Sequence, residues 1–361
     1  MRISIITVSF NAVKTIEQTI KSVITQSYEN IEYLIIDGQS TDGTGEIIQK
    51  YENTIDYFVS EPDEGIYDAM NKGLRKATGD VIGIINSDDW YEPDVISKIA
   101  RVFKTTDAEL VYGKIGIVND KGDISISANE PLNQLWHSMV TPHPSVFVRR
   151  EIYDKYGVFN TKFRIAADYE LMLRFYIAGV KFRYMDMVTV NFRTGGVSST
   201  RAVECAEETK TISLSYLERF PGNKEIVEEW IKKKYYGSKF MAMCNEKPLL
   251  LVNYLNVRFK RFRNEIIIFG TGIWGEHCYD LFRQCNIRVI AFVDNNKDKW
   301  GVKIHDIYVE NPRLLEETRG YVLIAVRYSG MEIGRQLENY NNKFLQWITI
   351  DEIISRISMI I

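Results

Sequence analysis

The sequence predicts an α/β protein with a mostly parallel sheet covered by helices on both faces, followed by a smaller α/β unit. From residue 2 to near residue 200, short β-rich runs alternate with helical patterns, which is typical of parallel strands joined by helices. The β signal then stops, and a new β-rich run, EIIIFGTG, begins at Glu265. We therefore expect a first domain at 1–202, a helical linker at 203–262 and a second domain at 263–361.

The first domain opens with four predicted strands, each followed by a helix or a polar loop. Ile16, Ile20 and Val23 recur at helical spacing after the first strand, and Ser and Asp are available to cap the helix after the second. The expected strands lie at 3–10, 31–38, 55–61 and 80–86, and the expected helices at 15–26, 40–51 and 65–77. The alternation continues more loosely through ELVYGKIGIV, PSVFVRR, DYELMLRFYIAG and FRYMDMVTVNF.

Composition limits the class of protein and its partners. The chain has 361 residues, 45% hydrophobic and 26% charged, as in ordinary globular proteins, and its net charge of -3 offers no basic field for nucleic acid. Its four cysteines form no CxxC pair and are read as reduced thiols. No run approaches the roughly 18 to 20 apolar residues of a membrane span. We expect a cytoplasmic protein, with peripheral membrane contact through the basic KRFR segment at 260–263 as an alternative to a solvated charged face.

Polar side chains follow all four of the first predicted strands. In open parallel sheets, ligands bind beyond the carboxyl ends of the strands, so these side chains should meet at one rim. A single acid there could instead cap a helix, but four successive strands ending this way predict a site. The residues concerned are Asn11, Asp37, Glu61, Asp63, Asp88 and Asp89.

The acids at this rim suggest the chemistry of the site. Oxygen ligands without paired His or Cys suit Mg²⁺ or Mn²⁺ rather than zinc, and such ions neutralise the charge on a departing diphosphate. The chain contains no GxxxxGK[ST] loop, which argues against a P-loop nucleotide hydrolase. Chemistry on a nucleotide sugar is the leading interpretation.

Several ordered motifs resemble those of family 2 glycosyltransferases with the GT-A fold. They are ITVSFN, LIIDGQSTDGT, SEPDEGIYDAMNKG, NSDDW, HPSVFVRREIYDKYGVF and AADYELMLRF, and they cover roughly residues 1 to 200. The resemblance implies transfer of a sugar from a nucleotide-diphosphate donor, first of all a UDP-sugar, with inversion at the anomeric carbon. The implied acceptor is a saccharide or a lipid-linked glycan in surface polysaccharide synthesis.

The resemblance also assigns roles to individual residues. It implies that Asp37 hydrogen-bonds the base or ribose, that Asp89 holds the metal and that Asp168 is the general base. Ala167 stands where the family often has Glu, and Met70 where many relatives have Arg, so the group that neutralises the phosphates beside the metal is open. The remaining implied donor-binding residues are Thr7, Ser9, Asn11, Asp63, Asn71 and Asp88.

Three later residues allow two readings each. Asp168 stands at the start of an amphipathic helix and could be its N-cap instead of a base that removes a proton from the acceptor hydroxyl. His143, between two prolines, could contact the metal or the diphosphate, or help to shape the acceptor pocket. Arg193 precedes Gly195 and Gly196 and could reach phosphate when that loop closes, or belong to an ordinary turn. Glu170 is expected to be exposed or to face the acceptor.

The second domain carries a motif of dinucleotide-binding proteins. FGTGIWG follows a predicted strand and opens a helix, placing Gly270, Gly272 and Gly275 in the GxGxxG pattern, with Asp294 closing the next strand. A Rossmann-like fold is expected, and the segment FVDNNKDKWG resembles small nucleotide-binding domains appended to sugar-modifying enzymes. The ligand could be a dinucleotide or a nucleotide sugar. Since no hydride-transfer residues follow, an accessory role is favoured.

Two rival functions remain open at this point. One is a bifunctional enzyme whose second domain uses a dinucleotide to modify a sugar nucleotide. The other is a degenerate transferase that only binds a nucleotide or scaffolds a complex, against which the intact acids argue. The base, the sugar, the acceptor and the oligomeric state depend on the shapes of loops and cannot be read from these patterns.

Overall fold

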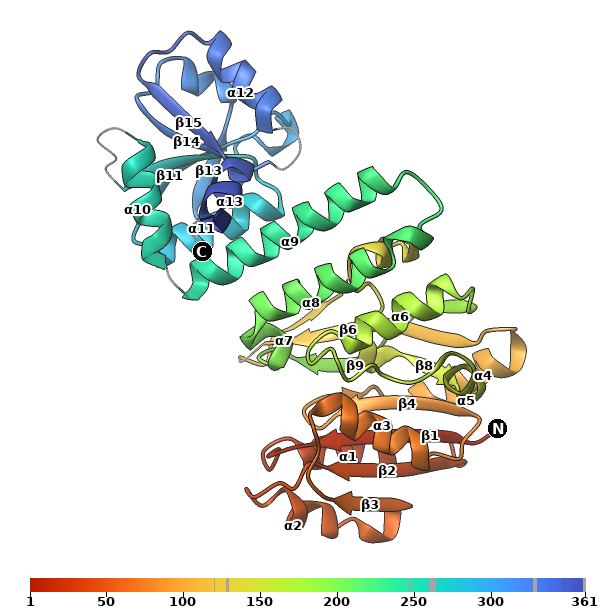
Figure 1. Cartoon of the computed structure of the whole chain (residues 1–361). Coiled ribbons are helices and arrows are strands. Elements are labelled where there is room, and N and C mark those ends of the chain that lie inside the picture. The colour runs from red at the N-terminus through yellow and green to blue at the C-terminus, as the bar shows by residue number, and fades with distance from the viewer. Residues whose placement is uncertain (120, 128–129, 247, 260–263, 327–329, 360–361) are drawn as a thin grey trace. The chain divides into compact units, whose positions relative to one another are not determined.

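The computed structural model describes residues 1–119, 121–127, 130–246, 248–259, 264–326 and 330–359. These fall into two compact units, Met1–Lys232 and Lys233–Ile361 (Figure 1). The division lies within the segment predicted as a helical linker, which is helical as expected and contains α8 (Ala202–Ser215), α9 (Lys224–Glu246) and α10 (Pro248–Arg258). The KRFR segment lies outside the described residues. No helix in the described ranges is both long and apolar enough to span a membrane.

The first unit is built on one mixed sheet with the order β3-β2-β1-β4-β8-β6-β9-β5, and β7 pairs with β6. Strands β3, β2, β1 and β4 are mutually parallel, and so are β6 and β9, whereas β8 and β5 pair antiparallel to their neighbours. The strands are β1 (Ile3–Ser9), β2 (Ile31–Asp37), β3 (Tyr57–Ser60), β4 (Val81–Asn86), β5 (Trp90–Tyr91), β6 (Leu110–Val118), β7 (Ile124–Ile126), β8 (Phe147–Arg149) and β9 (Phe182–Arg193).

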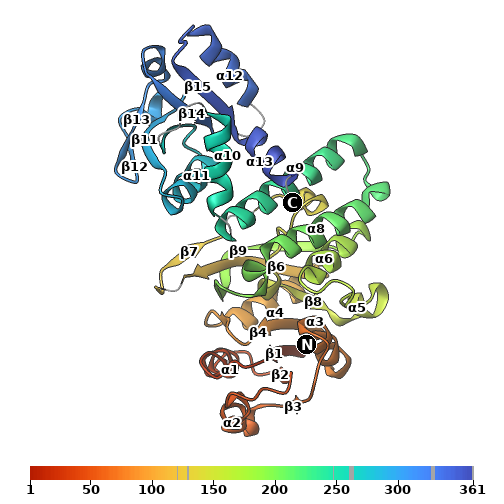
Figure 2. The same cartoon turned by 60° about the vertical axis from the view of Figure 1, so that its left-hand side comes forward.

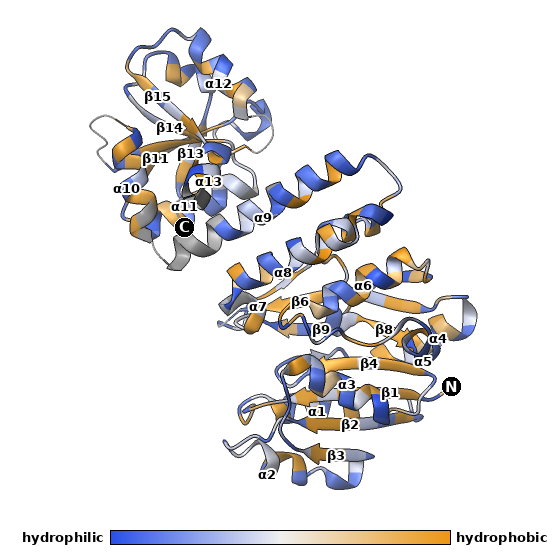
Figure 3. Cartoon of the chain, viewed as in Figure 1, coloured by the Kyte–Doolittle hydropathy of each residue, from blue (hydrophilic) through white to orange (hydrophobic). Residues whose placement is uncertain are grey.

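Helices cover both faces of this sheet, as predicted. One face packs α1 and α4 against Ile3, Ile5 and Ile35, and the other packs α3, α5 and α6 against Ile6 and Ile36 (Figure 2). Figure 3 shows β1, β2 and β4 as largely hydrophobic, because both faces of these central strands are buried. The helices are α1 (Ile16–Ile24), α2 (Thr44–Gln49), α3 (Ile66–Lys76), α4 (Val95–Thr105), α5 (Arg150–Tyr156), α6 (Ala167–Ile177) and α7 (Val197–Thr200).

The four predicted N-terminal strands and the helices between them are confirmed, with boundaries within a few residues of those expected. The expectation of a mostly parallel sheet is wrong beyond β4, where the sheet becomes mixed. Strands β5 and β8 are only two and three residues long, so they produce no alternation that a sequence pattern could reveal.

The second unit has its own six-stranded sheet, in the order β12-β13-β11-β10-β14-β15. All pairings are parallel except that of β12 with β13. A compact core around Phe269, Val293 and Ile324 lies against it. The elements are β10 (Glu265–Phe269), α11 (Ile273–Gln284), β11 (Arg288–Val293), β12 (Lys303–Ile304), β13 (Ile307–Glu310), β14 (Gly320–Ile324), α12 (Gly330–Asn339), β15 (Leu345–Thr349) and α13 (Ile350–Met359).

Candidate active site

Three cavities open around Ile66, the first residue of α3, beyond the carboxyl ends of β1, β2 and β4. A cavity of about 430 Å³ lies beside the ends of β1 and β2, and a second of about 120 Å³ extends from Asn86 to Asp168. A third, of about 180 Å³, lies on the other side of Tyr67 and is lined by Phe163 and Arg164. Cavities therefore lie beyond the carboxyl ends of the strands, where the sequence predicts a site.

The largest of these cavities is bordered by Ser9, Phe10 and Asp63. Asp63 Oδ1 accepts a hydrogen bond from the backbone N–H of Gly65 at 2.8 Å, which fixes the loop before α3. The Phe10 ring is 65% exposed at the cavity wall, an unusual position for a large apolar side chain directly after a buried strand. Sequence reasoning overlooked Phe10, although its place after β1 in ITVSFN would have allowed it to be found.

Asp37, which the sequence predicts to contact the base or ribose, is engaged by the protein itself. Its carboxylate is 1% exposed and does not line the cavity. It accepts hydrogen bonds from Ser9 Oγ at 2.8 Å, from the backbone N–H and Oγ of Ser40 at 2.9 and 2.6 Å, and from Ser60 Oγ at 2.6 Å. Asp37 therefore ties together the ends of β1, β2 and β3. It supports the wall of the cavity without lining it.

Three further residues expected to bind the donor make internal contacts in the structure. The Thr7 hydroxyl lies 3.0 Å from Tyr33 Oη inside the core. Asn11, in a left-handed conformation with φ 48°, accepts from the backbone N–H of Thr41 at 3.0 Å. Asn71 donates to Phe159 O at 2.9 Å and accepts from Phe159 N at 3.0 Å. None of the three lines a cavity around Ile66, so their contacts point to positioning of loops rather than to donor binding.

The acid pair after β4 consists of a half-buried Asp88 and a buried Asp89, with the guanidinium of Arg193 near them. Asp89 is fully buried, and its two oxygens accept from the backbone N–H of Arg193 and from Asn86 Nδ2, both at 3.1 Å. Burial and the neighbouring Asp88 raise the pKa of Asp89 well above its usual range, and burial also raises the pKa of Asp88. Among the described residues, the buried Oδ1 of Asn86 has no hydrogen-bond partner.

The Arg193 side chain contacts the loop that carries Asp88 and Asp89. Its Nε donates to Asp88 O at 3.0 Å, its Nη2 donates to Gln18 Oε1, and its guanidinium lies 4.6 Å from the centroid of the Trp90 ring. These contacts hold the end of β9 against β5 and against the acid pair. A swing of Arg193 toward phosphate, as the sequence allowed, would have to break all three.

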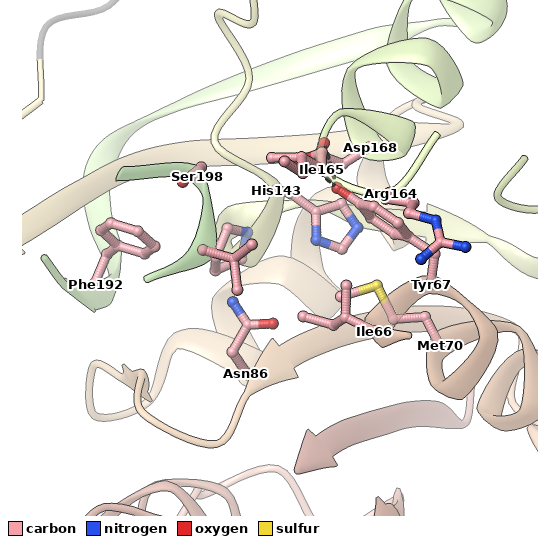
Figure 4. A pocket seen from close by; sticks show the side chains of 12 residues that line it. Ile66, Tyr67, Met70, Asn86, His143, Arg164, Ile165, Asp168, Phe192 and Ser198 are labelled. Atoms are coloured by element: carbon pink, nitrogen blue, oxygen red, sulfur yellow. Dashed lines mark hydrogen bonds between the residues drawn. The ribbon is translucent and has the colours of Figure 1, made fainter. Parts of the chain in front are cut away.

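Asp168 is the second residue of α6 and lines the cavity of about 120 Å³ together with Asn86 and His143 (Figure 4). The N-cap of this helix is Ala166, so the reading of Asp168 as the cap is wrong. Asp168 Oδ1 accepts from Tyr67 Oη at 2.9 Å. Burial and the Asp168 charge raise the pKa of Tyr67, which therefore remains a protonated donor.

The start of α6 is held by a residue that sequence reasoning missed. Glu208, on α8, accepts hydrogen bonds from the backbone N–H groups of Arg164, Ile165 and Ala166 at 2.8 to 2.9 Å. It thus satisfies backbone donors next to the helix terminus, as a capping side chain normally does, but from a distant segment. Nothing in the charged sequence of α8 distinguishes Glu208 from its solvated neighbours.

The expectation that Glu170 is exposed or faces the acceptor is wrong. Its side chain is buried, forms an ion pair with Arg174 Nη2 at 2.8 Å and accepts from Tyr216 Oη at 2.5 Å. Glu170 and Arg174 are four residues apart and so lie on one face of the helix, a spacing that could have predicted this ion pair. Glu170 therefore anchors α6, while Asp168 faces the cavity.

His143 lies with Asp168 rather than in a metal-binding group. Its ring is 7% exposed, packs edge-to-face on Phe159 with 5.3 Å between ring centroids, and lines the same cavity as Asp168. Burial lowers the pKa of His143, while the Asp168 charge opposes this shift. Across the described ranges, no three His, Cys, Asp or Glu side chains come together as a metal site, so the structure gives no support to His143 as a ligand beside Asp89.

In the second unit, the glycine motif forms a tight turn between β10 and α11. Gly270 has φ +104°, and a Cβ on Gly275 would lie 2.1 Å from Gly270 O, so both positions require glycine. Gly272 precedes the first residue of α11. Asp294 accepts from the backbone N–H of Thr271 at 3.0 Å and lies 3.4 Å from Lys299 Nζ, which ties its carboxylate to the turn.

Comparisons with known proteins agree with this arrangement of the first unit. The family described as Glycosyl transferase family 2 matches residues 4–166. An uncharacterized glycosyltransferase of Mycobacterium tuberculosis strain H37Rv is 35% identical over 180 residues, which cover 48% of this chain and 68% of the relative.

The chain belongs to glycosyltransferase family 2. It is therefore a glycosyltransferase. This argues against the alternative of a degenerate transferase that only binds a nucleotide or scaffolds a complex. A second relative of this family 2 glycosyltransferase is a PGL/p-HBAD biosynthesis glycosyltransferase of Mycobacterium bovis, 28% identical over 204 residues, covering 55% of this chain and 79% of the relative.

Two solved structures share the fold of the glycosyltransferase. Residues 1–349 of Staphylococcus aureus TarS in complex with UDP-GlcNAc superpose with a TM-score of 0.54 at 16% identity, over 68% of this chain and 76% of that fragment. The mannosyltransferase PcManGT of Pyrobaculum calidifontis, in complex with GDP-Man and Mn²⁺, gives 0.51 at 16% identity, over 72% and 81% of the two chains. The predicted GT-A type of α/β fold is thus supported for the first unit. Residues 262–344 match a different family, described as C2185-like, N-terminal.

Proposed function

We propose that this glycosyltransferase moves a sugar, with inversion, from a nucleotide-diphosphate donor to a hydroxyl of a saccharide or lipid-linked glycan. Asp168 is its general base, and a UDP-sugar is the first candidate donor. The observation that carries the proposal is that Asp168, from α6, and Asn86, beside the acid pair of β4, line one cavity. Two groups separated by more than eighty positions in the sequence thus face the same small space.

The cavity of about 430 Å³ suits the nucleoside part of the donor, since small-molecule sites of this kind have volumes of about 300 to 1,000 Å³. The exposed Phe10 ring offers a flat apolar surface on which a base can lie, and Asp63 and Ser9 provide polar atoms beside it. The fold neighbours TarS and PcManGT, whose structures contain UDP-GlcNAc and GDP-Man, support a nucleotide-sugar donor.

Asp168 is suited to act on the acceptor. An alcohol is a weak nucleophile, and a carboxylate in hydrogen-bond reach removes its proton while the new C–O bond forms. The Tyr67 hydroxyl and the backbone N–H of Tyr169 both donate to Oδ1 of Asp168, which fixes the carboxylate. In a single displacement, the acceptor oxygen bonds to the anomeric carbon, the bond to the diphosphate breaks, and Asp168 takes the proton.

The acid pair fits a divalent cation, for which Mn²⁺ or Mg²⁺ is proposed. Asp88 and Asp89 offer adjacent carboxylates, and burial raises the pKa of both, so a bound cation would stabilise their charged forms. Such oxygen ligands suit these ions, which commonly complete their shell with phosphate and water. When bound, the ion would stabilise negative charge on the departing diphosphate. The Mn²⁺ of PcManGT supports this assignment.

The acceptor would enter through the cavity of about 180 Å³, which adjoins Tyr67 and is lined by Phe163, Arg164 and Arg201. An aromatic ring beside guanidinium groups suits a carbohydrate that carries polar or anionic substituents. The PGL/p-HBAD biosynthesis relative supports an acceptor of the glycolipid kind. A cytoplasmic location, with contact at the inner face of the membrane, is proposed with it.

For the second unit, we propose a Rossmann-like accessory role. The order of its parallel strands, β13-β11-β10-β14-β15, supports the doubly wound topology, and the Gly270 turn before α11 supports binding of a nucleotide sugar or a dinucleotide. Against a dinucleotide, the Asp294 carboxylate that would receive a ribose hydroxyl is already bound to Thr271. A second catalytic activity therefore has less support than an accessory function.

The function is tested by screening UDP-, GDP- and dTDP-sugars for thermal stabilisation of the full chain, with and without MnCl₂. We expect one nucleotide class to raise the unfolding temperature only when Mn²⁺ or Mg²⁺ is present, and the effect to be lost in Asp89→Asn. The stabilising donor is then incubated with lipid-linked and free saccharides, and the anomeric configuration of the product is determined by NMR. A product with retained configuration, or stabilisation independent of metal, would contradict the proposal.

A further inference from the structure

His143 is the most conspicuous polar side chain that the proposed mechanism does not use. It is more than nine-tenths buried, yet it lines the cavity of about 120 Å³. Within the described part of the chain, its ring nitrogens make no hydrogen bond, and its contact with Phe159 involves only the ring. Since buried side-chain polar groups normally have a hydrogen-bond partner, a ring without a protein partner in the wall of a cavity points to a molecule bound there.

The same cavity contains a second unsatisfied atom. Asn86 donates its Nδ2 to Asp89, but its buried Oδ1 has no partner among the described residues. Figure 4 shows His143 between Asp168 and Asn86, with Pro144 and Met70 also contributing to the lining. Of the other lining residues, six are apolar, whereas Tyr67, Arg164 and Ser198 carry further polar groups. The Tyr67 hydroxyl already donates to Asp168.

The position of the cavity identifies which part of the substrates it holds. The acid pair beside Asn86 marks where the diphosphate would leave, and Asp168 marks where the acceptor oxygen would be activated. In an inverting displacement, the anomeric carbon lies between the leaving group and the nucleophile. The sugar being transferred therefore occupies the space between these two groups, which is the space that His143 borders.

The chemistry of His143 matches a sugar hydroxyl better than a phosphate. Burial lowers the pKa of this histidine, so the ring is neutral near pH 7, with one nitrogen as donor and the other as acceptor. A hydroxyl can both donate and accept, whereas a diphosphate calls for a cation. The backbone at His143 is held on both sides by Pro142 and Pro144, and Ser145 Oγ donates to Pro142 O at 2.7 Å, so the ring is presented by a stiff turn.

We propose that His143, assisted by Asn86 Oδ1, hydrogen-bonds a hydroxyl of the transferred sugar and selects which sugar the enzyme accepts. This inference rests on the proposed function, because it assumes that a nucleotide-sugar donor occupies the site. It adds a specificity-determining residue that acts neither on the metal nor on the nucleotide. It replaces the expectation that His143 contacts metal or diphosphate.

The test separates the affinity for the nucleotide from the affinity contributed by the sugar. Dissociation constants of UDP, UDP-glucose, UDP-galactose, UDP-N-acetylglucosamine, GDP and GDP-mannose are measured by calorimetry in MnCl₂. The wild type is compared with His143→Phe, which keeps an aromatic ring against Phe159 but removes both nitrogens, and with His143→Gln, which keeps a donor and an acceptor. The exposed His277 on α11 provides the control, His277→Phe.

In the wild type, the preferred nucleotide sugar should bind more tightly than its nucleoside diphosphate. We expect His143→Phe to reduce the ratio of these two affinities about tenfold, as for the loss of one buried hydrogen bond. The diphosphate alone should bind as in the wild type, His143→Gln should recover part of the loss, and His277→Phe should change nothing. An unchanged sugar contribution in a folded His143→Phe, or an equal loss for the diphosphate, would overturn the inference but leave the donor function intact. A wild type that binds none of the six probes and no dTDP-sugar of the earlier screen would overturn both.

Discussion

The two units of the molecule each place an acid at the end of the second strand of a parallel sheet, and comparing them shows what makes an acid functional. Asp37 at the end of β2 and Asp294 after β11 both turn back to the loop that follows the first strand, where they accept from Ser9 and Thr271 respectively. In both units, this acid builds the loop. The two units differ in the polar residues that surround this loop.

The first unit adds polar groups from distant segments that face a cavity. Asp168, His143 and Asn86 come from three separate segments and face one cavity. In the described part of the second unit, the cavity of about 210 Å³ lies elsewhere, between α12 and β15, and is lined by Leu337, Asn341 and Trp347. An acid at a strand end can therefore serve only to hold the adjacent loop in place. A site is indicated where such groups from separate segments line one cavity.

The largest effect should come from Asp168→Asn, which removes the proton acceptor but keeps an oxygen for Tyr67. We expect the rate of transfer to fall by about 10² to 10⁴-fold, as for the loss of a general base, with donor affinity nearly unchanged. Steady-state rates and calorimetric donor binding check this. Asp154→Asn, on the exposed side of α5, is the matched control. Full activity of Asp168→Asn would show that the cavity-facing acid is no more functional than Asp294.

A smaller effect is expected for Glu208→Gln, which tests whether a fully engaged acid can matter for rate. The amide places a donor against three backbone N–H groups, so the start of α6 should shift and the turnover number should fall roughly tenfold. Stability should also fall, by about 1 to 3 kcal/mol. Because the cavity proposed for the nucleoside has no α6 residue in its lining, the KM for donor should change less than the turnover number. If KM rises while the turnover number is kept, Glu208 does not position Asp168. Glu207→Gln is the control.

Gly38→Ala probes the loop that Asp37 organises. A Cβ at Gly38 would lie 2.4 Å from Asp63 Oδ2, so the Asp63 side chain must move within the large cavity. We expect nucleotide affinity to fall by about threefold to tenfold, at a free-energy change of about 1 kcal/mol. Gly45→Ala on α2, where a Cβ meets open space, should leave affinity unchanged and stabilise the protein slightly. Equal affinity in both variants would exclude this cavity as the nucleotide site.

The smallest effect on transfer is expected for Asp294→Asn in the second unit. Burial alone would raise the pKa of Asp294, but hydrogen bonds from Thr271 and Asn296 and the charge of Lys299 lower it. A lowered pKa in the folded state stabilises the fold above the ordinary pKa near 3.8, and this stability is lost as the pH falls through the folded value. The variant should therefore lose about 1 kcal/mol at neutral pH and less below about pH 4. Urea unfolding across pH measures this, and a large loss of transfer activity would contradict the accessory role.

Much of the first unit could be predicted from the sequence because its elements are locally encoded. The strands ending at Ser9, Asp37 and Asn86 are continuous apolar runs between turn residues, and the helices between them have clear periodicity. The position of Asp168 came from a motif rather than from periodicity, and the structure then placed it beside Asn86. Residue types and their order were sufficient for this level of prediction.

The partners of each polar group could not be predicted, since they depend on contacts between distant segments. Asn71 binds the backbone of Phe159, and Glu208 caps a helix that begins more than forty positions earlier. The sequence shows that such side chains can accept or donate, but it does not show whether the fold already satisfies them. For that reason Asp37 and Asn71 were expected to face the donor, whereas Phe10 and Glu208 were overlooked.

One covalent segment, residues 193–208, links the two sides of the reaction. At its start, the backbone N–H of Arg193 donates to Asp89, and at its end the carboxylate of Glu208 holds the first residues of α6. Between these anchors, Val197 and Ser198 line the cavity. The segment thus joins the loop of Asp89 to the start of α6, and we expect its length to limit how far the proposed base, Asp168, can lie from the acid pair. Insertions or deletions within this segment should therefore be far less tolerated than substitutions along it.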